Sequence, residues 1–271
     1  MTVHVRGVIH RFLHTTPGAL PFRSGTRSKC RGNHAVPFRG ESGPNVMREE
    51  AGPIVHRAVR SGSVILILGG LEFIAGMILA QTQYAGYSLT QNYISDLGGA
   101  NSPWWAVFDA SVILLGVAAI FGALLVWSAF EERPSRGIGL GFLVIAGIGA
   151  IGVGVFPETT PVLGGQMHTI VSLIAFLGGG LGILILSYAM VDHPRWRVAR
   201  PFARVCGLVT LVALVLFTIG GYVGSVFYLG IGPGGMERLI VAPILLWAIV
   251  EGAHLYRLPR YAPSLVPKTP A

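Results

Sequence analysis

A few acids, a histidine and an arginine stand among long apolar stretches of this sequence and are its main candidates for chemistry. In chain order they are Glu72, Asp96, Asp109, Glu158, His168, Glu237 and Arg238, with Asn92 and Ser95 close to the first aspartate. Ionisable groups are costly inside an apolar protein and usually face the interior of a helix bundle. We therefore take these residues as the candidate site, and we expect all of them except Glu72, which falls near the midplane of its span, to lie on one face.

One chemistry that these residue types allow is catalysis. Carboxylates with His168 could bind a metal, or pair as acid and base to hydrolyse a lipid or envelope substrate, with Asp96, Asp109, His168 and Glu237 as the catalytic candidates. Ser95 beside Asp96 also permits a serine-hydrolase arrangement with His168. Against this class, the sequence contains no G-x-S-x-G and no H-E-x-x-H. A zinc site with a single outward histidine would need mostly carboxylate ligands, which is less usual.

Two further classes of function stay open. Glu72 near the midplane and Asp109 above it could be steps in a proton or cation path of a carrier, although the chain shows no detectable inverted repeat. Alternatively the protein is a non-catalytic assembly protein in which the polar residues hold the helices together. The interpretation that we favour is an outward-facing polar site for a small ligand or a lipid headgroup, with Asn92, Ser95, Asp96, Asp109, Glu158, His168, Glu237 and Arg238 as its ligand-binding candidates.

The elements that must position these residues are membrane helices. Only 12% of the 271 residues are charged, against about 25% in ordinary soluble domains. About 20 mostly apolar residues are needed to cross a bilayer as a helix. Six windows of the sequence meet this requirement: Ser63–Gln83, Trp104–Phe130, Gly137–Phe156, His168–Met190, Ala203–Val226 and Met236–Leu255. The predicted fold class is an all-α integral membrane protein with a six-helix bundle.

Basic residues predict the orientation of this bundle. From Met47 onward, twelve Lys and Arg residues lie before the first span, after the last span and in the loops that follow the second and fourth spans, whereas the other three loops contain none. Basic loops are typically cytoplasmic. We therefore expect both termini in the cytoplasm, with the basic residues near anionic lipid headgroups rather than nucleic acid. Nothing in the sequence indicates a particular oligomeric state.

The chain is predicted to have three parts: a basic N-terminal tail over residues 1–60, a membrane domain over 61–256, and a short cytoplasmic tail over 257–271. Residues 1–46 are rich in arginine, contain no acid before Glu41 and have no long apolar run. This composition is typical of a disordered tail or a targeting peptide. Met47, followed by Arg48, Glu49 and Glu50, is also a plausible alternative start.

Local signals predict a short amphipathic helix in the first outer loop. Ser88 and Gln91 have the spacing of a capping box, and Gly98 with Gly99 supplies a stop. A helix over Leu89–Leu97 places Asn92 and Asp96 four residues apart on one face.

Glycines and cysteines bear on the choice of cofactor. The run 147–152 matches G-x-G-x-x-G, but it lies within a span with no preceding strand, so it indicates close helix packing rather than nucleotide binding. The two cysteines, Cys30 and Cys206, form neither a disulfide framework nor a cysteine-based zinc site. No cofactor is therefore identified from the sequence.

Several short motifs taken together resemble a known family. They are the run 92–98 (NYISDLG), Asp109 in the next span, the run 156–158 (FPE), His168 at the start of the fourth span, and the run 235–238 (GMER) at the start of the sixth. In these motifs residues 60–255 resemble the uncharacterised six-helix family catalogued as domain of unknown function 998. The resemblance implies an integral membrane bundle of prokaryotic cell membranes and supplies candidate positions, but no reaction.

Overall fold

The computed structural model describes residues 44–190 and 193–258, and within these ranges every regular element is helical. The predicted N-terminal tail lies mostly outside the described residues, as does most of the predicted C-terminal tail. Six long helices form the fold: α1 (Pro44–Gln83), α2 (Trp105–Leu125), α3 (Pro134–Val155), α4 (Gln166–Leu186), α5 (Ala199–Tyr222) and α6 (Gly232–Arg257).

All six helices are long and apolar enough to cross a membrane. Each contains or overlaps one predicted window, so the prediction of a six-helix membrane fold is confirmed. The first helix is longer than predicted, because α1 begins at Pro44 and its apolar part spans Val55–Gln83. The helix therefore includes residues that the sequence assigned to the tail, Met47 among them.

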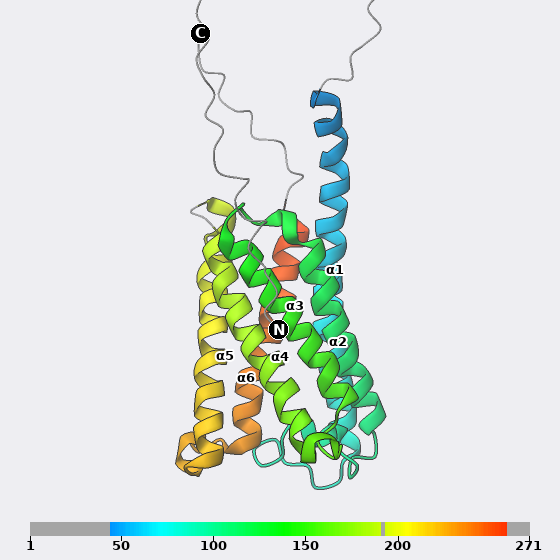
Figure 1. Cartoon of the computed structure of the whole chain (residues 1–271), viewed down its shortest axis with the longest axis vertical. Helices are drawn as coiled ribbons and strands as arrows, with labels where there is room; N and C mark the ends of the chain where they lie inside the picture. The colour runs from blue at the N-terminus through cyan, green and yellow to red at the C-terminus, as the bar shows by residue number, and fades with distance from the viewer. Residues whose placement is uncertain (1–43, 191–192, 259–271) are drawn as a thin grey trace, which may run out of the picture. The chain divides into compact units, whose positions relative to one another are not determined.

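The helices run alternately up and down (Figure 1), and the contacts between them close into a ring. Each helix packs against its neighbours in the chain, and α6 packs against both α5 and α1. The connections that follow α2, α3, α4 and α5 are short, and short connections favour this arrangement because they leave consecutive helices antiparallel and adjacent. The connections α1–α2, α3–α4 and α5–α6 meet at one end of the ring, which we call the non-basic end, and the arginine-containing connections lie at the other, basic end.

Glycines bring the helix backbones close together. A Cβ atom added at Gly116 of α2 would lie 2.5 Å from the carbonyl oxygen of Gly147 in α3, and one added at Gly147 would lie 2.6 Å from the carbonyl oxygen of Gly116. One added at Gly149 would lie 2.5 Å from the Ala175 nitrogen in α4. The run 147–152 therefore packs helices, as the sequence predicted.

The prediction of a helix over Leu89–Leu97 is wrong. Residues 88–92 form a turn, and only the 3₁₀ helix η1 (Ser95–Gly98) follows. The turn does begin as a helix would, since the Asn92 amide donates to the Ser88 carbonyl at 2.9 Å. The next two amides, of Tyr93 and Ile94, donate instead to the carboxylates of Asp96 and Glu237, so the helix cannot continue.

Candidate functional site

Arg238 fastens the first loop to the start of α6. Its Nη1 donates to the carbonyl oxygens of Leu89 at 2.9 Å, Asn92 at 3.1 Å and Gly234 at 2.9 Å. Its Nη2 donates to the Tyr87 hydroxyl at 2.7 Å, and that hydroxyl donates to the Tyr93 carbonyl at 2.7 Å. Burial raises the pKa of Tyr87, and Arg238 opposes the rise. We call this contact, between residues 87–94 and 232–238, the loop–α6 interface.

Arg238 binds oxygen atoms of the loop and of α6 rather than a carboxylate. Within the described ranges, the structure contains ion pairs from Arg136 and Arg195, but none from Arg238. The guanidinium, which has five N–H donors, donates instead to three oxygen atoms of the loop, namely the carbonyl oxygens of Leu89 and Asn92 and the Tyr87 hydroxyl.

Glycines at the start of α6 make this interface possible. The Gly234 amide donates to the Thr90 carbonyl at 2.9 Å. A Cβ atom added at Gly234 would collide with the carbonyl oxygen of Asn92, and one at Gly232 with that of Thr90. Gly232 also has a φ of +74°, which disfavours any other residue. The glycines of the segment 230–235 therefore allow the backbone of the first loop to pack directly against the start of α6.

Glu237 is buried beneath the same loop. It is 6% exposed, and its Oε2 accepts a hydrogen bond from the Ile94 amide. Asp96 organises the neighbouring turn, because its Oδ2 accepts from the Asn92 side-chain amide at 3.0 Å and from the Tyr93 amide at 2.9 Å. The structure thus brings Asn92, Asp96 and Glu237 together, although the sequence expected the first two on a helix.

Glu158 lies in the neighbouring α3–α4 connection, and His168 lies in the first turn of α4. Partial burial raises the pKa of Glu158, the nearby charge of Asp96 raises it further, and His168 opposes the rise. His168 Nδ1 contacts the Phe156 carbonyl at 2.9 Å, and because a carbonyl only accepts, Nδ1 carries the proton. His168 Nε2 lies 3.4 Å from the Ser172 hydroxyl. The serine that His168 contacts is therefore Ser172, one turn away on α4, and not Ser95.

The two remaining acids of the candidate set lie in α1 and α2. Asp109 is 6% exposed in α2 and lies against Gly98, where an added Cβ atom would be 3.3 Å from the carboxyl carbon. Glu72 is half-buried in α1, and its Oε2 is buried with no hydrogen-bond partner among the described residues. The structure therefore places Asp109 beneath the first loop and leaves Glu72 apart from it.

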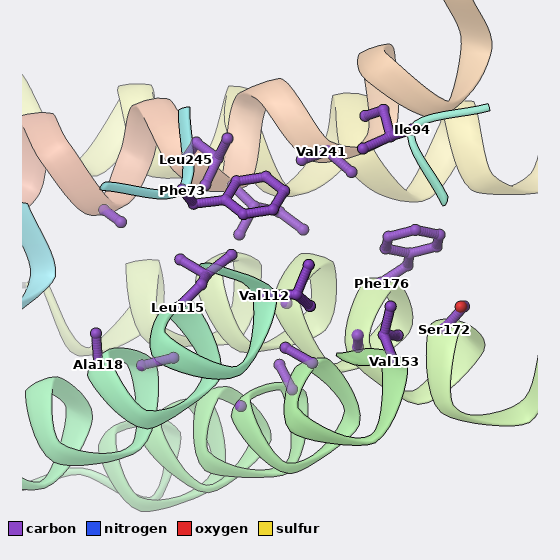
Figure 2. Close-up of a pocket in the computed structure, with 18 of the residues that line it drawn as sticks. Phe73, Ile94, Val112, Leu115, Ala118, Val153, Ser172, Phe176, Val241 and Leu245 are labelled. Atoms are coloured by element: carbon purple, nitrogen blue, oxygen red, sulfur yellow. The ribbon is translucent and has the colours of Figure 1, made fainter. Parts of the chain in front are cut away.

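A cavity of about 130 Å³ lies inside the ring and reaches Glu237 at the non-basic end. Figure 2 shows side chains from α1, α2, α3, α4 and α6, and Ile94 of the first loop, around this space. Its lining contains no residue of α5. The polar side chains in the lining are Ser95, Ser172 and Glu237. Many of the other lining residues are alanine or glycine, and these small residues leave the centre unfilled.

Glu251 of α6 is a buried acid that the sequence analysis missed. It is 0% exposed, and neither carboxyl oxygen has a hydrogen-bond partner in the described part of the chain. Trp247, which lines the cavity, and His254 lie on the same side of the helix, at spacings of four and three residues. That spacing was the available signal, and it places a second polar group towards the basic end.

Two further kinds of binding site were considered, a metal site and a hollow at the basic end. In residues 44–190 and 193–258, no three His, Cys, Asp or Glu residues come together so as to hold a metal ion. A shallow hollow of about 560 Å³ at the basic end is lined by His193, Pro194, Trp196, Arg197, Arg200, Pro201 and Arg204.

These features define a class of protein, and comparison with known proteins defines the family. Six apolar helices in a ring are the architecture of a multi-pass integral membrane protein, whose surroundings are the lipid bilayer. The family model described as "Protein of unknown function (DUF998)" matches residues 67–254. The chain belongs to this family, as its motifs indicated. No curated protein and no solved structure matches the chain.

Proposed function

We propose that this protein binds a lipophilic small molecule in the cavity inside the helix ring, with the polar group of that molecule beside Glu237. The observation that carries the proposal is the cavity itself, an apolar space with a carboxyl group and two hydroxyl groups in its lining. Sites for small molecules are typically apolar pockets with a few convergent polar groups. Two of the residues predicted from sequence, Ser95 and Glu237, supply that polar part together with Ser172.

The size of the cavity supports its interpretation as a binding site for a small molecule rather than as a packing defect. A cavity of comparable size, about 150 Å³ and lined by apolar side chains, stays dry and takes up benzene. At about 24 cal/mol per Å³, leaving 130 Å³ unfilled lowers the free energy of unfolding by about 3 kcal/mol. A ligand with an apolar body recovers part of that cost.

A pair of alanines on α2 tests the proposal. Ala119 lines the cavity, whereas Ala110 is exposed on the outside of the ring. Toluene is expected to raise the melting temperature (Tm) of the wild-type protein in lipid nanodiscs. In Ala119→Leu the larger side chain occupies the cavity, so we expect the Tm of this variant not to respond to toluene. The Tm of Ala110→Leu should respond as the wild type does. An equal response in both variants would show that toluene acts through the lipid, and the proposal would fail.

We further propose that the non-basic end, with Asp96 and Glu158, faces outward from the cell membrane of a prokaryote. The arginine distribution supports this orientation. The hollow lined by Arg197, Arg200 and Arg204 supports contact with anionic headgroups on the cytoplasmic side.

Cysteine labelling tests the orientation. With Cys30 and Cys206 replaced by alanine, a cysteine at Asn101 in the exposed first loop should react with an impermeant thiol reagent added outside intact cells. A cysteine at Ser135, at the start of α3, should react only after the cells are opened. The reverse pattern overturns the proposed orientation.

A further inference from the structure

The charge of the cavity lining narrows the class of ligand. We infer that the ligand is a lipophilic cation, an ammonium group on a small apolar or aromatic body, whose charge lies against Glu237. This inference rests on the proposed function, since it concerns the same cavity.

Glu237 is the first part of the argument. Among the described residues that line the cavity, Glu237 is the one ionisable side chain, and no Lys, Arg or His is present. The adjacent Arg238 is bonded to loop carbonyls and to Tyr87, and in the described part of the chain it makes no ion pair with a carboxylate. Glu237 therefore accepts a hydrogen bond from the Ile94 amide and feels the charge of the adjacent Arg238, but in the described part of the chain no cationic side chain forms an ion pair with its carboxylate.

Aromatic rings are the second part. Phe73, Phe108, Phe176 and Trp247 line the cavity from four different helices. The Phe73 and Phe108 ring centroids are 5.9 Å apart, and both residues are almost fully buried. Figure 2 shows Phe73 and Phe176 on either side of the space into which Val112 projects. Faces of aromatic rings attract cations, and most strongly where water is excluded.

These two features together select charge. A cation buried in an apolar space loses its hydration, a cost of several kcal/mol that needs a counter-charge. Glu237 supplies the counter-charge and the rings supply further attraction. A ligand with a carboxylate, such as a fatty acid, would instead meet the carboxyl group of Glu237, and no described residue of the cavity lining supplies a cationic side chain for it. A neutral ligand would gain the apolar contact alone.

A matched set of small probes tests this selection. Benzylammonium, benzyl alcohol and benzoate share one aromatic body of a size suited to about 130 Å³ and differ in charge. Dissociation constants are measured by calorimetry on the purified full chain in nanodiscs of zwitterionic lipid. We expect benzylammonium to bind at least about tenfold more tightly than benzyl alcohol, and benzoate to bind least.

Two variants identify the group that selects charge. Glu237→Gln keeps an oxygen for the Ile94 amide but removes the charge, so we expect it to bind both neutral and cationic probes with similar affinity. Glu132→Gln removes an acid whose side chain is 90% exposed and does not line the cavity, so the preference should persist.

Each outcome of the experiment is informative. Equal binding of benzylammonium and benzyl alcohol by the wild-type protein overturns the cation inference, while binding of both leaves the proposed function standing. Absence of binding by all three probes overturns the proposed function as well. A preference that persists in Glu237→Gln overturns the assignment to Glu237. The comparison of probes on the wild-type protein decides the charge of the ligand even where a variant fails to fold.

Discussion

Replacing Arg238 by methionine is expected to detach the first loop from α6. Methionine retains most of the apolar stem but donates no hydrogen bond. Three of the lost bonds join the loop to α6, those to Leu89, Asn92 and Tyr87, and the first is exposed to water. At about 1 kcal/mol for each part-exposed bond, the free energy of unfolding should fall by about 3 kcal/mol. For a chain of this length that corresponds to a decrease in Tm of about 6–12 °C.

Thermal unfolding followed by tryptophan fluorescence measures this decrease. Arg257→Met is the matched control, because Arg257 is exposed at the opposite end of the same helix, and its Tm should change by no more than about 2 °C. Arg238→Lys should lie between the two, since an ammonium group cannot span several acceptors as a guanidinium does. A cysteine at Ser88 should also be labelled faster in Arg238→Met. If the two methionine variants melt together and label alike, the interface does not depend on Arg238 and the reasoning is refuted.

Three further substitutions have expected outcomes. Gly234→Ala should lower Tm because the added Cβ atom collides with the Asn92 carbonyl, whereas Gly221→Ala, which has room for a Cβ atom, should not. Glu251→Leu should raise the free energy of unfolding by about 1–3 kcal/mol in a denaturant titration, because it removes a buried carboxyl group without a partner among the described residues; a loss would show that this group binds something. Glu158 has a raised pKa when folded, so its contribution to stability is present below its unfolded pKa and disappears as the pH rises through the folded pKa. Glu158→Gln should therefore be more stable than wild type at pH 7 and lose this advantage near pH 4, and an advantage independent of pH would contradict this assignment.

The fold could be predicted from the sequence because hydropathy in windows of about 20 residues reflects the solvent of each helix directly. The ends of the helices were harder to predict from the sequence. The predicted first span began at Ser63, whereas α1 begins at Pro44, because a helix can continue beyond the apolar part of its sequence. The loop helix over Leu89–Leu97 failed for a different reason. Its capping signals were local, but the Ile94 amide donates to Glu237, which lies 143 residues further along the chain.

The candidate site was predictable in its members more than in its contacts. Acids in apolar stretches are few, so Asp96, Asp109 and Glu237 could be chosen by type and position alone. The partners of Arg238 could not, because backbone carbonyls give no signal in a sequence. Glu251 was missed because it falls near the end of the last predicted window, where the side chain of an acid can reach the membrane–water interface. The cavity depends on small residues of four helices meeting at one place, and no single segment contains that pattern.

Closure of the ring by α6 has a consequence for synthesis in the membrane. Helices α1 to α5 each pack against the helix that precedes or follows them, so these contacts can form as the chain emerges. The 26 residues of α6 supply the contact that closes the ring against α1, the hydrogen-bond partners of the first loop and one side of the cavity. A nascent chain that stops before Gly232 therefore presents an apolar groove and an unsatisfied loop. Because chaperones and proteases in cells act on incompletely folded protein, early termination should lead to degradation rather than to a smaller stable protein.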